Sequence, residues 1–391
     1  MPKGFSAAGI SAGIKKNGKK DLGLIYCEKP ATVAGVFTKN RVTAACVELD
    51  RKRLAQSGAC QAIIVNSGNA NCCTGDAGMA DAVSMGKSAA SVLGIDENHV
   101  MVASTGVIGQ RLPVQKVETA VPELAARLAP DGFSDFAESI MTTDTHPKVV
   151  TRQGDINGAA FTVTGVAKGA GMIRPDMATM LCFVCTDVGI SREDLQASTV
   201  RANDQSFNCI TIDGDTSTND TLLVLASGLS RATVSTPDHL GAFEQTLEAV
   251  LAELAKMIVK DGEGATKLVT ISVVNAASDG EAKQIAQTVA NSNLVKTAFF
   301  GEDANWGRIV AAMGRAGVDF DYGRVDLYFN DVRLVENGEY AGAAAEEAAT
   351  AVLRLPAFDV RLDMKSGAGR AHVWTCDFSI DYVKINADYR T

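Results

Sequence analysis

The amino-acid sequence predicts an α/β protein, and two patterns lead to this prediction. Short apolar runs that favour strands alternate along the chain with longer segments whose apolar residues recur at helical spacing. The composition is that of a globular protein, because 46% of the 391 residues are hydrophobic and 21% are charged. A chain of this length can bury substantial cores and form two domains.

The predicted elements follow one another in chain order. Apolar runs rich in β-branched residues predict strands at 33–38, 61–65, 99–104, 161–167, 221–227, 268–277, 324–330 and 371–379. Apolar residues at helical spacing predict helices at 79–94, 118–129, 239–262, 281–292 and 342–355. The run "TMLCFVCT", residues 179–186, is typical of a short buried strand. No internal repeat or low-complexity segment marks a domain boundary.

Charge and cysteine content narrow the class of protein. The formal net charge of −9 argues against a nucleic-acid-binding protein, which needs a basic face. The amino terminus has lysines without the apolar core of a secretory signal, and no apolar run approaches the length of a membrane span. Nine scattered cysteines, an odd number, indicate reduced thiols. We therefore expect a cytoplasmic protein with small-molecule partners.

Several short motifs resemble cofactor or metal sites but do not complete them. The stretch "KGAGMIRPD" lacks the third glycine of a dinucleotide fingerprint, and "DGEGATKL" lacks the spacing of a phosphate loop. The pair Cys182 and Cys185 lies in an apolar run, which favours buried thiols over a redox pair. The four histidines have no zinc-ligand spacing. We expect neither a cofactor nor a metal.

The polar segment "TIDGDTSTNDT", residues 211–221, has two interpretations. Its aspartates are oxygen ligands of the kind that a divalent cation takes, although the segment fails the EF-hand template. Its aspartate, asparagine, serine and threonine side chains also favour a turn that caps itself, and this interpretation is preferred.

Thr179 stands in an unusual junction, after the glycine-rich stretch "KGAGMIRPDMA" and before the apolar run "MLCFVC". If the bond between Ala178 and Thr179 is cut, Thr179 becomes an amino-terminal residue. Its α-amine, a group whose pKa in peptides is near 8, can then act as the base for its own hydroxyl. The cut can be made by the chain itself if the hydroxyl attacks the carbonyl of Ala178 and water hydrolyses the resulting ester. Backbone strain in the glycine-rich approach would assist this step.

The chain resembles the ornithine acetyltransferase family, also called glutamate N-acetyltransferases. The processing-site signature is "KGAGMIRPDMATML". Further matching stretches, in the same order as in the family, are "VNSGNANCCTG", "STGVIG", "MTTDTHPK", "DGDTSTNDT", "DGEGATK", "EDANWGRI" and "YVKINADYRT". The resemblance covers essentially the whole chain.

The resemblance implies a precursor that cleaves itself before its nucleophile. Residues 1–178 would form an α chain and residues 179–391 a β chain. The implied fold is a layered α/β sandwich similar to the amino-terminal nucleophile hydrolases and grouped with the DmpA-like aminopeptidases. The implied assembly is an α2β2 heterotetramer.

The implied reaction is an acetyl transfer in arginine biosynthesis. Thr179 takes acetyl from N-acetylornithine, releases ornithine and passes the acetyl group to glutamate, and no cofactor is needed. Thr105 and Gly106 in "STG" match the family's oxyanion hole, although alone this stretch is typical of a turn. Some members also use acetyl-CoA as donor, and no residue that we can name separates the two groups.

The resemblance also implies a set of substrate-binding residues. Lys168 matches a lysine that would bind the substrate carboxylate, although a lysine beside glycines is otherwise typical of the surface. Glu263 matches an acidic residue that would pair with a cationic group of ornithine. The alternative is that this segment only ends the preceding predicted helix. Asn386 and Thr391 match polar residues of the family's carboxyl terminus. In "MTTDTHPK" the spacing favours Thr145 over Thr143 as the substrate-binding threonine.

Two other functions stay open at this point. The same threonine with water as acceptor would make the chain an amino-terminal-threonine aminopeptidase or amidase of the DmpA type. A small-molecule-binding protein that keeps the fold without the chemistry would never cleave itself.

Overall fold

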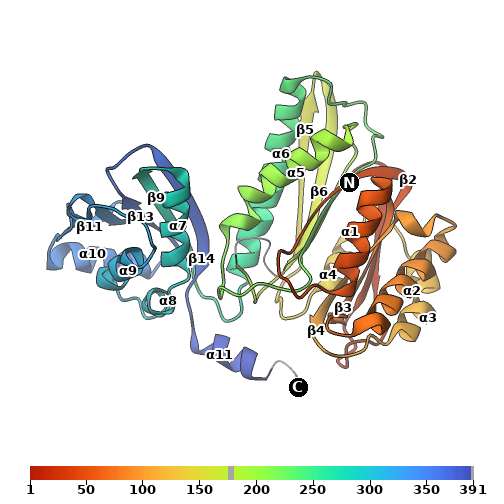
Figure 1. Ribbon diagram of the computed structural model, residues 1–391, viewed down its shortest axis with the longest axis horizontal. Helices are drawn as coiled ribbons and strands as arrows, with labels where there is room; N and C mark the ends of the chain where they lie inside the picture. Colours follow the sequence, from red (N-terminus) through yellow and green to blue (C-terminus); the bar gives the residue numbers. More distant parts are fainter. Residues whose placement is uncertain (175–179, 389–391) are drawn as a thin grey trace. The chain divides into compact units, whose positions relative to one another are not determined.

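The computed structural model describes residues 1–174 and 180–388 (Figure 1). Ala178, Thr179 and Thr391 therefore lie outside the described residues. The chain divides into two compact units, the first made of Met1–Asn208 with Asp215–Ile258 and the second of Cys209–Gly214 with Val259–Thr391. The division of the fold therefore does not follow the predicted cleavage at residue 179.

The first unit is built on an eight-stranded sheet whose main path has the order β4-β3-β2-β8-β7-β6-β5, with β1 paired to β2. The strands are β1 (Phe5–Ile10), β2 (Leu22–Phe37), β3 (Ala59–Asn69), β4 (Val100–Val107), β5 (Lys148–Ile156), β6 (Ala159–Lys168), β7 (Leu181–Thr186) and β8 (Thr221–Ala226). The pairs β3–β4 and β7–β8 are parallel, and the others are antiparallel. The sheet is therefore mixed.

Strand β2 changes partner along its length. Its first half pairs with β3, the register shifts between Tyr26 and Ala31, and its second half, Thr32–Phe37, pairs with β8. One buried core accordingly contains Ile25, Ile63 and Met101 from one half of the sheet together with Val166, Phe183 and Leu223 from the other. The two halves of the sheet thus fold toward each other, and this brings distant strands close together.

Helices cover the sheet of the first unit. They are α1 (Ala45–Ser57), α2 (Gly75–Leu93), α3 (Val114–Ala126), α4 (Phe133–Ile140), α5 (Arg192–Asp204) and α6 (Pro237–Lys260), whose last two residues belong to the second unit. Figure 1 shows α1, α2 and α3 gathered beside β3 and β4. Helix α4 lies in the same buried core as the two halves of the sheet, where Phe136 packs edge-on against Phe183. Short 3-10 turns occur at Glu97–His99 and Phe207–Cys209.

The second unit has a six-stranded sheet of order β12-β11-β10-β13-β9-β14. Its strands are β9 (Leu268–Ala276), β10 (Asp326–Phe329), β11 (Val332–Glu336), β12 (Glu339–Tyr340), β13 (Ala357–Asp363) and β14 (Gly369–Cys376). Its helices are α7 (Asp279–Ala290), α8 (Asn293–Phe300), α9 (Trp306–Gly314), α10 (Ala343–Leu353) and α11 (Ile380–Ala387), with a 3-10 turn at Tyr322–Arg324. This unit has its own core, in which Ile271, Val360 and Val373 of the sheet pack with Ile285 of α7.

The α/β prediction is confirmed, and each predicted strand and helix overlaps an observed element, although β2 begins at Leu22, well before the predicted start at residue 33. The elements that the sequence patterns did not predict are β1, β5, β11, β12, β13, α1, α4, α5, α8, α9 and α11. Helix α5 is an example of why some helices were not predicted. It buries the polar residues Ser198, Thr199 and Asn203 and therefore lacks a continuous apolar stripe.

Within residues 1–174 and 180–388, no helix combines the length and apolar character needed to cross a bilayer.

Candidate active site

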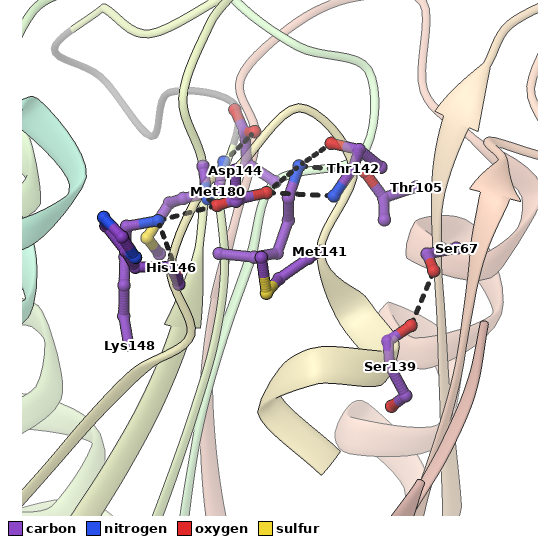
Figure 2. Close-up of polar contacts among 12 residues, drawn as sticks. Ser67, Thr105, Ser139, Met141, Thr142, Asp144, His146, Lys148 and Met180 are labelled. Atoms are coloured by element: carbon purple, nitrogen blue, oxygen red, sulfur yellow. Dashed lines mark hydrogen bonds and ion pairs between the residues drawn. The ribbon is translucent and has the colours of Figure 1, made fainter. Parts of the chain in front are cut away.

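Lys168, the last residue of β6, is buried in a polar cluster of the first unit, part of which is drawn in Figure 2. Its ammonium donates to the hydroxyl of Thr142 at 2.8 Å and to the hydroxyl of Thr105 at 3.4 Å. Only 4% of the residue is exposed, so it is not the solvated surface lysine that neighbouring glycines suggest. The contact with Thr105 joins the end of β6 to β4, which lies at the far edge of the sheet.

Asp144 is the carboxylate at the centre of this cluster (Figure 2). One oxygen accepts from the ammonium of Lys148 at 2.8 Å and from the amide of Gly169 at 2.7 Å. The other accepts from the amide of Thr142 at 3.0 Å and lies 3.8 Å from the ammonium of Lys168. Burial opposes ionisation, yet the two ammonium groups and these donors hold the pKa of Asp144 well below its ordinary value.

Two cations converge on Asp144. The ammonium groups of Lys148 and Lys168 both lie against this carboxylate, and the side chains of all three residues are at least 96% buried. Buried ammonium groups are stabilised by anions and by hydrogen-bond acceptors. The arrangement therefore suits a ligand that carries a carboxylate.

Thr105 and Gly106 lie in β4, where the parallel register with β3 places Gly106 opposite Gly68. The "STG" stretch is thus part of a strand and not the turn that its composition suggests. Gly106 has φ = +133°, and a Cβ added there would lie 2.3 Å from the carbonyl carbon of Gly68. Only glycine satisfies both the backbone conformation and the close approach.

Met180 directly follows Thr179 in the sequence and is hydrogen-bonded to residues at the start of β8. Its amide donates to a carboxylate oxygen of Asp220 at 3.0 Å, and its carbonyl accepts from the amide of Thr221 at 3.1 Å. Asp220 is 1% exposed, and burial raises its pKa well above the ordinary value. The chain just after the predicted cleavage position is therefore held by backbone and carboxyl contacts.

The polar segment that precedes β8 caps itself, as the preferred interpretation predicted. The amide of Asn219 donates to the hydroxyl of Ser217, and the hydroxyl of Thr221 donates to the carbonyl of Asn219. The side-chain amide of Asn219 also donates to the carbonyls of Ala70 and Ser104 at 2.7 and 2.8 Å. This segment thus ties the start of β8 to the ends of β3 and β4.

Glu263 and Asn386, both predicted site residues, meet in the second unit. The side-chain amide of Asn386 donates to Glu263 at 2.7 Å, and Glu263 is 8% exposed. The loop that carries Glu263 is held by the buried carboxylate of Asp377, which accepts from the amides of Thr266 and Lys267 at 2.8 and 2.9 Å. Glu263 therefore does more than mark the end of the preceding helix, which ends at Lys260.

The structure brings Thr105 and Lys168 together, and it adds residues that the sequence analysis did not select. Thr142, which the sequence analysis did not select, accepts a hydrogen bond from the ammonium of Lys168 through its hydroxyl. Lys148 and Asp144 lie within the quoted stretch "MTTDTHPK", but only the fold shows that their charges converge. Among the other predictions, the thiols of Cys182 and Cys185 are buried, which raises the pKa of both.

The fold and the cluster define a class of protein: a mixed α/β protein with a buried polar cluster in which two lysines converge on one aspartate. Comparison with known proteins narrows the class. The model of the ArgJ family matches residues 6–391. The arginine biosynthesis bifunctional protein ArgJ of Geobacter sulfurreducens is 52% identical over 100% of this chain and 99% of its own length. The chain therefore belongs to the ArgJ family, and it is an acetyltransferase of arginine biosynthesis. The family resemblance drawn from the motifs is thus confirmed.

Two solved structures are similar to parts of this chain. A crystal structure of the arginine biosynthesis bifunctional protein from Bacillus halodurans is 41% identical, with a TM-score of 0.50 over 52% of this chain and 97% of that chain. The ornithine acetyltransferase of Mycobacterium tuberculosis, complexed with ornithine, is 37% identical, with a TM-score of 0.40 over 44% of this chain and 92% of that chain.

Proposed function

We propose that the chain cleaves itself between Ala178 and Thr179 and then carries acetyl from N2-acetyl-L-ornithine to L-glutamate on the hydroxyl of Thr179. The observation that carries the proposal is the buried cationic cluster around Lys168. Lys168 is the register partner of Leu181, so the strand that follows Thr179 in the sequence begins beside this lysine. The cluster therefore lies beside the strand that begins two residues after the proposed nucleophile in the sequence.

The chemistry requires few groups. The α-amine of Thr179 takes the proton of its own hydroxyl, and the oxygen attacks the acetyl carbonyl. The α-ammonium returns this proton to the nitrogen of the departing ornithine as the tetrahedral intermediate collapses to the acetyl ester. Glutamate then attacks the acetyl ester, and Thr179 is regenerated. The oxyanion of each step needs preorganised donors, and we assign this role to Thr105 and Gly106. Gly106 suits the role because its φ of +133° and the nearness of Gly68 leave no room for a side chain beside its peptide.

The substrate carboxylate is assigned to Lys168 and Thr142. Both donors lie within 2.8 Å of each other, and the two ammonium groups around Asp144 attract an anion. This assignment adds Thr142 to the predicted Thr145, because the hydroxyl of Thr142 contacts the lysine. Glu263 and Asn386 of the second unit, which contact each other, and Thr391 keep their predicted role as substrate-binding residues in this proposal.

Self-cleavage is supported by the length of a solved relative. The matched chain of the Bacillus halodurans protein is about half as long as this chain, since 52% of this chain covers 97% of it. A half-length chain is what cleavage before Thr179 would produce.

The proposal includes an α2β2 assembly of the two products and a cytoplasmic location.

Acetyl-CoA is proposed as a second acetyl donor to glutamate. Relatives that match the whole of this chain are named bifunctional. A second donor would make the first acetylglutamate as well as recycle the acetyl group.

Intact-mass spectrometry under denaturing conditions tests the proposal. We expect two polypeptides divided before Thr179, and an added acetyl mass on the second one after N-acetylornithine is supplied without glutamate. Glutamate should remove that mass and yield acetylglutamate. Thr179→Ala should stay whole and gain no acetyl, whereas Thr186→Ala, at the end of β7, should still cleave.

Other outcomes separate the competing functions. Loss of the acetyl mass in water alone, without glutamate, would favour the aminopeptidase or amidase. A wild-type chain that stays whole and unacetylated would favour the binding protein. A Thr179→Ala chain that still divides would assign the cut to another nucleophile.

A further inference from the structure

The loop between β1 and β2 has a fixed shape because it wraps around a buried carboxylate. Asp21, at the end of this loop, is fully buried, and its oxygens accept from the amides of Ala12, Ile14 and Lys15 at 2.6, 2.6 and 2.8 Å. The same residue joins the loop to β3, because its carbonyl accepts from the amide of Ser67. The backbone of Lys15 is therefore anchored to the first unit.

The side chain of Lys15 points from this loop to the active-site cluster. Its ammonium donates to the carbonyl of Lys20 at 2.7 Å and to the carbonyl of Met141 at 2.8 Å. Met141 immediately precedes Thr142, the threonine that contacts Lys168. Lys15 thus fixes the peptide that carries one of the two proposed carboxylate donors.

The aliphatic part of Lys15 also contacts the oxyanion strands. A Cβ added at Gly68 would lie 3.1 Å from the Cγ of Lys15, and Gly68 is the register partner of Gly106. One side chain therefore lies beside Gly68, the register partner of Gly106, and holds the peptide before Thr142. This position connects the two halves of the proposed site.

The charges that face Lys15 come from several elements. Burial disfavours its ammonium most strongly, and the ammonium groups of Lys168 and Lys19 add repulsion, while the carboxylates of Asp21 and Asp144 attract it. The balance lowers the pKa of Lys15 to about 8.

We propose that Lys15 is a positioning residue of the acetyl-transfer site, which holds the Met141–Thr142 peptide in place and adds a cation for the substrate carboxylate. The inference rests on the proposed function of the Lys168 cluster. It assigns the site a third lysine, besides Lys148 and Lys168, from a loop that the sequence motifs did not select.

The proposal makes the substrate affinity depend on pH in a defined direction. Below pH 8 the ammonium carries its charge, and above pH 8 the neutral amine keeps N–H donors but loses the charge. The KM for N-acetylornithine should therefore rise as the pH increases through about 8. An arginine keeps its charge throughout this range.

The test compares steady-state kinetics of the cleaved wild type with Lys15→Met, Lys15→Arg and the neighbouring Lys16→Met between pH 6 and pH 10. Lys16 serves as the matched control because it is an exposed lysine of the same loop. At pH 7 we expect Lys15→Met to raise KM about tenfold, the effect of losing a charge-assisted contact, with a smaller change in kcat. Lys15→Arg should restore a low KM and remove its rise above pH 8, and Lys16→Met should behave as wild type.

Two results would overturn the role of Lys15. One is a Lys15→Met variant that is folded by circular dichroism and keeps the wild-type KM and pH profile. The other is a Lys15→Arg variant whose KM still rises at pH 8. Failure of the wild type to transfer acetyl at all would instead overturn the proposed function, so the two failures are distinguishable.

Discussion

At the scale of single residues, the peptide at Gly106 shows how a site can depend on the absence of a side chain. Its φ of +133° is available almost only to glycine, and the carbonyl carbon of Gly68 occupies the place of a Cβ. The two glycines face each other across a parallel strand pair. Because Thr105 is next to Gly106, any movement of this peptide changes the distance from Thr105 to Lys168.

Gly106→Ala should therefore lower acetyl transfer at least tenfold through kcat, because the strand must shift to admit the methyl group. The strain should also lower the free energy of unfolding by roughly 1 to 3 kcal/mol. The matched control is Gly109→Ala, since Gly109 also has positive φ but open space around it. Kinetics and urea unfolding of both variants check this expectation, and equal kcat in the two would contradict it.

At the scale of elements, α1 protects the edge of the sheet that carries the oxyanion residues. Strand β4 is the last strand on one side of the sheet. The carboxylate of Asp50 in α1 accepts from the amide of Val102, with the two oxygens at 2.9 and 3.1 Å, and Arg53 donates to the carbonyl of Val100 at 2.5 Å. Two side chains thus satisfy backbone groups of an edge strand that would otherwise be open to another strand.

Asp50→Ala should lower the free energy of unfolding by roughly 1 to 3 kcal/mol, because it leaves the buried amide of Val102 without an acceptor. Asp50→Asn keeps an acceptor oxygen and should cost less. Burial raises the pKa of Asp50 well above its ordinary value, so the site disfavours the charge that Asp50→Asn removes. Urea denaturation, with exposed Lys52→Ala on the same helix as control, measures the difference. An Asp50→Ala protein as stable as Asp50→Asn would contradict this account.

At the scale of the whole molecule, the predicted cleavage would divide the chain but not the sheet. Residues before Thr179 supply β1 to β6, and residues after it supply β7 and β8. These two strands lie in the middle of the sheet, where β8 pairs with β2 and β7 pairs with β6. Separation of the two products would expose an edge of each of β2, β6, β7 and β8 and part of a buried core.

The two cleavage products should therefore migrate as one species on a native size-exclusion column and as two bands under denaturing electrophoresis. In a urea titration they should separate only within the unfolding transition. The uncut Thr179→Ala protein is the control, and it should elute at the same volume. Release of either product without denaturant would show that the shared sheet does not hold the chains together.

Much of the secondary structure was predictable because apolar periodicity reports burial directly. The long amphipathic pattern around 239–262 became α6, and the apolar run around 221–227 became β8. Helices such as α1 escaped prediction because their buried faces carry charged residues, Asp50 and Arg53, that pair with a strand edge. Such pairing depends on a neighbour distant in sequence, so no local pattern reveals it.

The sequence by itself determined the α/β class, the family resemblance and the expectation that Thr179 is a nucleophile, because these depend on residue types in fixed order. Only the tertiary structure decided that Thr142 is the threonine on Lys168, that Asp144 lies between two lysines, and that Lys15 reaches the same cluster. These contacts join β4, β6 and two loops, since the sheet folds over at β2. The folded sheet brings these charged side chains together, and the spacing of the residues along the chain does not reveal that they meet.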